Sequence, residues 1–307
     1  AESLMHIEID RQPKDALPAI KTRILGVLED VRAIVADWEP MRDRMREVAD
    51  DLATRKLPVT EAGRHEAQEF LRWAAEDHFT FFGYREYKVE KQGKEDVLVA
   101  VPGTGMGLLR GEDSGKPRLL KSMAAHGMPQ SGSVDALILT KTNARASVHR
   151  QGYMDYIGVL GFDGKGRATS EQRFLGLYTS SAYNRRPWDI PLVRERHAYV
   201  MEKSGLEPFS HSGKALRHIL ESLPRDELFQ SGEEELFKTC MGILGLQERV
   251  RSKLFLRRDR YGRYFSALVY VPRDRMSTSV RHRIEAMLRD ALGGERVDTN
   301  VQIGDSP

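Results

Sequence analysis

The sequence has little cysteine: Cys240 is the single one among 307 residues. One cysteine per chain excludes an intrachain disulfide and a thiolate metal cluster, and both exclusions fit the reducing cytoplasm. No stretch approaches the roughly 20 apolar residues that a helix needs to cross a bilayer. The first ten residues carry acidic side chains where a signal peptide has basic ones before an apolar run. We therefore expect a soluble, cytoplasmic chain without a metal site and without a membrane partner.

The sequence also lacks an excess of charge of one sign. Its 48 basic and 45 acidic residues give a net charge of only +3, and the two kinds are interspersed almost everywhere. Without a basic face to neutralise phosphates, nucleic acid is not an expected partner. Hydrophobic residues make up 40% and charged residues 30%, as in a globular protein. The length allows about two domains of about 100–200 residues each.

Motifs of catalysis are missing as well. The sequence contains no H-E-x-x-H, no G-x-S-x-G and no P-loop. A glycine-rich turn with Gly103, Gly105 and Gly107 follows an apolar run at 96–101, but the spacing is G-x-G-x-G and the third glycine comes one residue early for a dinucleotide fingerprint. We expect a tight turn, with nucleotide binding at Gly103 to Gly107 as the less favoured alternative. No catalytic or cofactor-binding residue is predicted in this chain.

The strongest periodic pattern lies near the N-terminus. Apolar residues recur there in alternating steps of four and three, which is the a/d seam of a heptad repeat. Pro40 interrupts the pattern and indicates either two helices in series or one kinked helix. The seam faces either the rest of this chain, which we favour, or another subunit that a helical arm contacts. Its members are Ile20, Ile24, Val27, Val31, Ile34, Trp38, Met41, Met45, Val48 and Leu52.

Farther along, a helix is expected from Thr60, a good N-cap, to about Asp77. Aromatic and β-branched runs then predict strands at 79–87, 96–101, 136–140, 156–162 and 174–178. Most of these runs are joined without intervening helices, which favours an antiparallel sheet.

Helical patterns return after residue 210. One helix is expected at 213–222, and the next starts with a capping box formed by Ser231 and Glu234. Cys240 falls on the apolar face of that second helix, where it is a small core residue rather than a nucleophile. Two strands at 253–256 and 266–271 and a helix at 278–292, ended by Gly293, complete a β-β-α unit.

The predicted fold class is therefore α+β: N-terminal helices, a mostly antiparallel sheet with flanking helices, and a partial β-β-α unit. We divide the chain into a helical segment at 1–77, an antiparallel β domain at 78–205, a helical connector at 206–250 and a truncated domain at 251–307.

A group of arginines gives the one candidate binding site. Three of them fall on or beside the expected strands close to tyrosines, and a guanidinium can hold a carboxylate through two parallel hydrogen bonds. This chemistry suits recognition of an amino acid or oxo acid. The favoured alternative is an ordinary set of surface and cross-strand pairs, with Glu171 and Asp155 as partners. The candidate effector-binding residues are Arg145, Arg150, Arg173 and Tyr178.

Three stretches are specific enough to indicate a family. They are FLGLYTSSAY at 174–183, LPRDELFQ at 223–230 and LVYVPRDR at 268–275, supported by FLRW at 70–73, FFGYR at 81–85 and SHSGK at 210–214. In this order and spacing the chain resembles, from about residue 61 to about 292, the very long-chain bacterial NAD-specific glutamate dehydrogenases.

The resemblance implies a role that composition does not show. In that family a downstream catalytic domain interconverts L-glutamate and 2-oxoglutarate plus ammonia with NAD, after a long region of PAS-like and ACT-type modules that serves regulation and oligomer contacts. The resemblance makes the sheet region PAS-like and the last unit ACT-like. It implies a non-catalytic regulatory or oligomerisation segment of such an enzyme, with the catalytic domain, further copies of the chain and an amino-acid effector as partners. A purely structural scaffold is the alternative.

Overall fold

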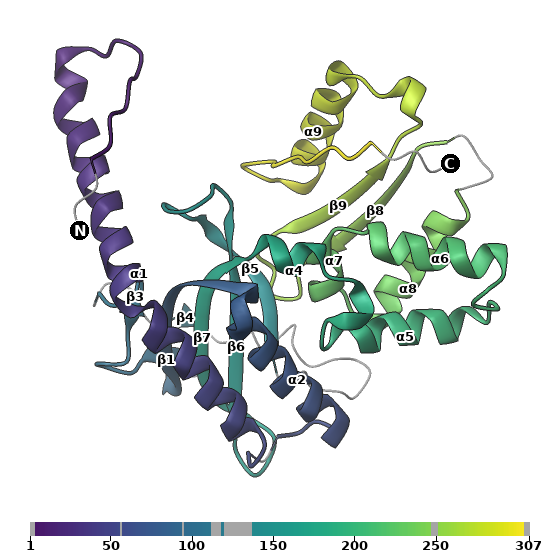
Figure 1. Ribbon diagram of the computed structural model, residues 1–307, viewed down its shortest axis with the longest axis horizontal. Helices are drawn as coiled ribbons and strands as arrows, with labels where there is room; N and C mark the ends of the chain where they lie inside the picture. Colours follow the sequence, from purple (N-terminus) through teal and green to yellow (C-terminus); the bar gives the residue numbers. More distant parts are fainter. Residues whose placement is uncertain are drawn as a thin grey trace.

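The structure is a computed structural model and describes residues 4–55, 57–93, 95–111, 118–119, 137–246 and 251–303. Ala136, at the start of one expected strand, lies outside the described residues. Helices, a curled seven-stranded sheet and a separate two-stranded sheet form the molecule (Figure 1), so the predicted α+β class is confirmed.

The elements follow the chain in four groups. The N-terminal part contains η1 (Lys14–Ala16), α1 (Leu17–Leu52), α2 (Glu61–Trp73) and η2 (Ala74–His78). The large sheet contains β1 (Phe79–Gln92), β2 (Glu95–Ala100), β3 (Met106–Gly107), β4 (Arg118–Leu119), β5 (Leu137–Arg145), β6 (Tyr153–Phe162) and β7 (Ala168–Tyr178). Next come α4 (Ser180–Asn184), η4 (Pro187–Asp189), α5 (Val193–Ser204), α6 (His211–Ser222), α7 (Arg225–Gln230) and α8 (Glu233–Leu244). The last group contains β8 (Lys253–Arg258), β9 (Phe265–Tyr270), η5 (Arg273–Arg275) and α9 (Thr278–Leu292).

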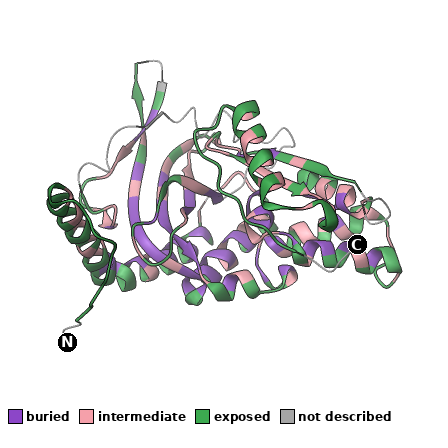
Figure 2. Cartoon of the chain, turned by 90° about the horizontal axis from the view of Figure 1, so that it is seen from above, coloured by how far each residue is buried: buried purple, intermediate pink, exposed green. Residues whose placement is uncertain are grey.

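The large sheet has the strand order β4-β2-β1-β7-β6-β5, with β3 paired to β1, and all these pairs are antiparallel. Side chains of a strand alternate between the two faces of a sheet. In β7, Phe174 and Tyr178 therefore join the core beneath α1 and α2, whereas Leu175 and Leu177 join a second core on the other face. The sheet is buried on both faces along much of its length (Figure 2).

Helix α1 is one continuous helix that includes Pro40. Its C-terminal part contributes Met41, Met45 and Leu52 to the core, each fully buried. Its N-terminal part extends away from the sheet (Figure 1), and no residue before Ile34 in α1 is buried. The C-terminal part of the heptad seam thus packs against this chain, whereas the N-terminal part lies exposed.

The glycine-rich turn holds α1 against the sheet. The amide of Gly107 donates to Oδ2 of Asp37 at 2.7 Å, and the guanidinium of Arg110 donates to Oδ1 of the same carboxylate at 2.5 Å. Gly107 has a φ of +58°, and a Cβ there would collide with the carbonyl oxygen of Phe82. The geometry is that of the expected tight turn, and the amide of Gly107 is bound to a carboxylate of this chain.

Most of the expected helix ends agree with the structure. The hydroxyl of Thr60 accepts from the amide of Gly63 at 3.1 Å, and α9 ends at Gly293 in the left-handed conformation. The capping box at Ser231 was wrong: Gly232 is the N-cap of α8, and the Ser231 hydroxyl donates to Glu227 instead. The hydroxyl of Ser231 is used elsewhere because Glu227 is a buried carboxylate, which requires several hydrogen-bond donors.

Candidate regulatory site at helix α7

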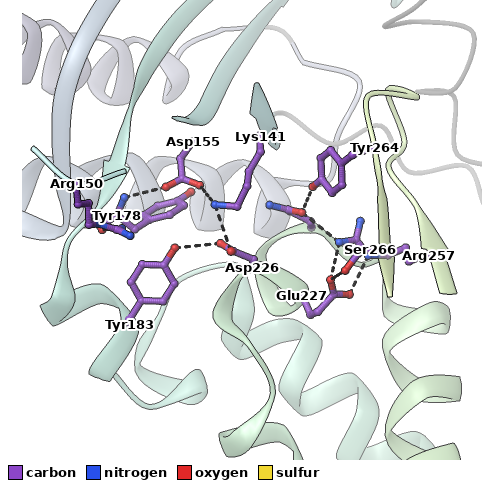
Figure 3. Close-up of polar contacts among 11 residues, drawn as sticks. Lys141, Arg150, Asp155, Tyr178, Tyr183, Asp226, Glu227, Arg257, Tyr264 and Ser266 are labelled. Carbon is purple, nitrogen blue, oxygen red and sulfur yellow. Dashed lines mark hydrogen bonds and ion pairs between the residues drawn. The ribbon is translucent and has the colours of Figure 1, made fainter. Parts of the chain in front are cut away.

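Helix α7 lies between the large sheet and the β8–β9 hairpin (Figure 3). It follows Pro224 and carries two consecutive acidic residues, Asp226 and Glu227. Consecutive positions of a helix are separated by about 100° around its axis. The two carboxylates can therefore reach different neighbours, and each of them meets a basic side chain from a different sheet.

On the side of the large sheet, Asp226 meets a cluster built around Lys141. The Lys141 ammonium donates to Oδ1 of Asp155 at 2.6 Å and lies 3.2 Å from Oδ2 of Asp226. Lys141 and Asp155 are direct cross-strand partners in β5 and β6. The Tyr183 hydroxyl donates to Asp226 at 3.2 Å, and the amide of Tyr178 donates to Asp155 at 3.0 Å. One lysine thus joins two carboxylates from the sheet and from α7.

Burial controls the protonation of this cluster. Asp155 is fully buried, and the loss of solvation raises its pKa from 3.8 to about 6, although the Lys141 charge acts in the opposite direction. Burial alone would lower the pKa of Lys141, but attraction to Asp155 and Asp226 outweighs it and raises that pKa. The lysine therefore stays charged while Asp155 titrates at mildly acidic pH.

On the side of the hairpin, Glu227 forms a bidentate ion pair with Arg257 of β8. Nε and Nη2 of Arg257 donate to the two carboxylate oxygens, both at 2.9 Å. The hydroxyls of Ser231 and Ser266 also donate to this carboxylate, and Gln230 accepts from Arg257 at 3.1 Å. Burial would raise the pKa of Glu227, but the hydrogen bonds and charge of Arg257 lower it. Both partners are buried, and both carboxylate oxygens of Glu227 accept hydrogen bonds from Arg257 and from a serine.

Two further contacts join the large sheet to the hairpin directly. The Thr140 hydroxyl donates to Oδ1 of Asp259 at 2.8 Å, and both residues are buried. The guanidinium of Arg263 donates to the carbonyl oxygen of Lys141 at 3.2 Å and lies over the ring of Tyr156. The sheet, α7 and the hairpin are therefore connected in a closed set of polar contacts.

The structure brings two of the four predicted effector residues together. The Arg150 guanidinium donates to the carbonyl oxygen of Tyr178 at 2.9 Å and lies over the ring of Tyr183, next to the Lys141 cluster. The Tyr178 ring is buried and stacks on Phe229 of α7.

The other two lie elsewhere. Arg173 belongs to the opposite face of the sheet from Tyr178, where it is buried and paired with Glu171 at 2.9 Å. Arg145 ends β5, is partly exposed and pairs with Asp298 at 2.5 Å. Arg173 is therefore paired with Glu171, but within β7 and not across strands as expected, and Asp155 is paired with a lysine.

Sequence reasoning missed the α7 network. Lys141, Asp226, Glu227 and Arg257 were not singled out as site residues, although the stretch 223–230 carried the family resemblance. The available signal was a pair of adjacent acidic residues beside the apolar Leu228 and Phe229 on a short helix, since charged groups are seldom buried without partners.

Other chemistry is limited within the described part of the chain. No group of three or more His, Cys, Asp or Glu residues there could hold a metal ion. No helix in that part is long and apolar enough to cross a membrane. Cys240 is buried, as expected of a core residue, and burial raises the pKa of its thiol to about 12.

These features define an α+β protein in which a helical unit connects a large antiparallel sheet to a small β-β-α unit. Two glutamate dehydrogenase models match the C-terminal part: helical motif 1 at residues 190–249 and the ACT2 domain at residues 253–307. The first match includes α5, which our division at residue 205 had placed with the sheet. Helix α7 belongs to the matched helical motif, and β8, β9 and α9 belong to the ACT2 domain.

Relatives extend this similarity over the whole chain. The chain is 38% identical over 99% of its length to the NAD-specific glutamate dehydrogenase of Halomonas elongata, and 40% identical over 95% to that of Pseudomonas aeruginosa. The protein of the same name from Mycobacterium tuberculosis is 28% identical over the full chain. The chain spans 18–19% of the length of these relatives. The resemblance to the large NAD-specific glutamate dehydrogenases is thereby confirmed, and the chain corresponds to one section of such an enzyme.

The ion pair at Glu227 gives a stability prediction. Replacing Glu227 with Gln leaves Arg257 buried without a negative partner, which we expect to lower the free energy of unfolding by about 3–5 kcal/mol. Chemical denaturation measures this change. Glu47→Gln, which removes the exposed pair with Arg44, serves as a control and is expected to cost less than about 1 kcal/mol. Equal effects of the two substitutions would contradict the account.

The raised pKa of Asp155 gives a pH prediction. Between its unfolded pKa of 3.8 and its folded pKa of about 6, the folded state holds a proton that the unfolded state releases. The contribution of Asp155 to stability therefore decreases as the pH rises through this window. Urea unfolding should show that Asp155→Asn gains stability relative to the parent chain between pH 4.5 and pH 7. The opposite change would mean that Lys141 keeps Asp155 ionised throughout.

Proposed function

We propose that this chain is a regulatory and assembly segment of a large NAD-specific glutamate dehydrogenase that acts in the cytoplasm. In this proposal the full polypeptide interconverts L-glutamate and 2-oxoglutarate plus ammonia, and the catalytic residues and the NAD site lie outside this segment. The similarity over the whole chain to relatives of that name supports the proposal. So does the match of residues 253–307 to an ACT domain of glutamate dehydrogenase.

The observation that carries the regulatory role is the position of α7. Asp226 joins it to the large sheet, and Glu227 joins it to the ACT-type unit. A change in the position of one unit must therefore break or move buried charge contacts to the other. An effector that binds one arrangement better than the other would shift the equilibrium between them. The large sheet, as a PAS-like module, and the ACT-type unit would respond together.

The effector in this proposal is an amino acid or oxo acid, held by its carboxylate. Arg145 and Arg150 lie at the two ends of the loop between β5 and β6, and Tyr178 positions Arg150 through its carbonyl oxygen. Arg173 is buried on the opposite face of the sheet, where its ion pair with Glu171 stabilises the sheet. A carboxylate at Arg145 would compete with Asp298, which follows α9. Binding would thus be linked directly to the ACT-type unit.

A thermal-unfolding panel tests the effector. Glutamate, aspartate, arginine, glutamine, 2-oxoglutarate and NAD are compared with a ligand-free control. A ligand at about 100 times its dissociation constant adds about 2.7 kcal/mol to the native state, which for a chain of this size raises the midpoint by several degrees. We expect a shift with one amino acid or oxo acid, lost in the double variant Arg145→Met/Arg150→Met and kept in Arg167→Met, which removes an exposed arginine.

The panel also separates the alternatives. A midpoint that no ligand changes would contradict effector binding and leave the chain as a structural scaffold. A shift with NAD, abolished by Gly105→Ala, would instead favour a nucleotide site at the glycine-rich turn.

A further inference from the structure

The N-terminal part of α1 presents an apolar seam that the rest of the described chain leaves partly exposed. From Leu17 to Val31 the a and d positions of the heptad repeat continue for two heptads, before Ile34, which is buried in this chain's own core. Ile24 is 53% exposed, Val27 39% and Val31 38%. The same seam is fully buried three turns later, at Met41 and Met45. Figure 2 shows this part of α1 as an exposed helix at the edge of the molecule. A continuous apolar stripe of this length is typical of a helix that pairs with another helix.

We propose that a second copy of this chain covers the seam, with the two α1 arms pairing side by side in antiparallel orientation. The inference rests on the assembly role proposed above and gives that role a surface, a partner and a register. Ile24 of each copy packs against Val27 of the other at the centre of the pair. The flanking layers combine Ile20 of each copy with Val31 of the other.

Charge determines the direction and register. Arg23 and Asp30 both occupy the g position beside the seam, one heptad apart. With Ile24 opposite Val27, Arg23 of each copy faces Asp30 of the other, which gives two ion pairs of opposite charge. Flanking charges of this kind select partner and orientation in coiled coils.

The other arrangements lack these pairs. Sliding one helix by a heptad in one direction places Asp30 against Asp30, and sliding it in the other direction places Arg23 against Arg23. A parallel pair would place Arg23 beside Leu28 and Asp30 beside Val35 of the second copy. The central antiparallel register is therefore the one in which both charges are matched.

The surroundings of the arm allow this pairing. The arm extends away from the sheet (Figure 1), and in an antiparallel pair the two bodies lie at opposite ends of it. Asp30 accepts a hydrogen bond from the hydroxyl of Ser147 at 2.6 Å. A carboxylate accepts several hydrogen bonds, so this contact leaves room for the arginine of the second copy.

Sedimentation velocity on the 307-residue chain tests the pairing by charge reversal. Arg23→Glu makes both g positions acidic, and Asp30→Arg makes both basic, so each variant alone would place like charges in contact twice. We expect each to dimerise at least tenfold more weakly than the parent chain. An equimolar mixture of the two restores opposite charges at both contacts and should form a heterodimer. Arg32→Glu, an exposed reversal outside the seam, is the control and should leave the dimer unchanged.

Circular dichroism and the thermal midpoint establish that each variant is folded. Single variants that dimerise like the parent chain, or a mixture that stays monomeric, would overturn the arm pairing and leave the assembly role to another surface. At about 100 μM, pairs of micromolar affinity are formed. A parent chain that remains monomeric at this concentration would overturn both the arm pairing and the proposed assembly role. Effector binding, measured by the ligand panel, is independent of either outcome.

Discussion

The arrangement of the C-terminal half depends on the buried ion pair between Glu227 and Arg257. Burying two charges is unfavourable unless the geometry is good and the remaining hydrogen-bonding groups are satisfied. Here the pair is bidentate, and Ser231, Ser266 and Gln230 occupy the remaining positions. Such a pair contributes little stability compared with an apolar contact of the same size, but it tolerates only one relative position of α7 and β8. We interpret it as a device that defines the position of the ACT-type unit.

The adjacent Asp226 extends this constraint to the large sheet. Lys141 of β5 is shared between Asp226 of α7 and its cross-strand partner Asp155, so that one lysine connects α7 to the sheet. The Arg173–Glu171 pair on the other face of the sheet differs, because both partners belong to β7 and join no second unit. Buried charge therefore has two roles in this protein: it supports the sheet at Arg173 and connects units at α7. The second role is the one on which the proposed regulatory function depends.

Local signals in the sequence predicted much of the fold. Alternating aromatic and β-branched residues located the long strands, and Thr60 and Gly293 marked the helix ends where the structure has them. The prediction that Ser231 caps α8 was wrong, because its hydroxyl donates to the buried carboxylate of Glu227. The heptad periodicity predicted a seam but not its partner, because periodicity carries no information about what lies opposite.

The site could be predicted only in part. Arginines near strands were a sensible signal for carboxylate recognition, and Arg150 and Tyr178 do lie together. The network around Lys141 was inaccessible to sequence reasoning, since Lys141 and Asp226 lie far apart in the chain and their contact depends on how α7 docks on the sheet. A short helix with two adjacent acidic residues indicates buried charge, but the position of its partners is a property of tertiary structure.

Native-state hydrogen exchange on the variant Arg257→Met tests most directly the claim that α7 couples the two units. The substitution lies in β8 and removes the partner of Glu227. The account predicts that amides of β5 around Lys141 lose protection together with those of β8 and β9, because α7 transmits the change. Loss of protection confined to the β8–β9 hairpin, with β5 unchanged, would contradict the coupling.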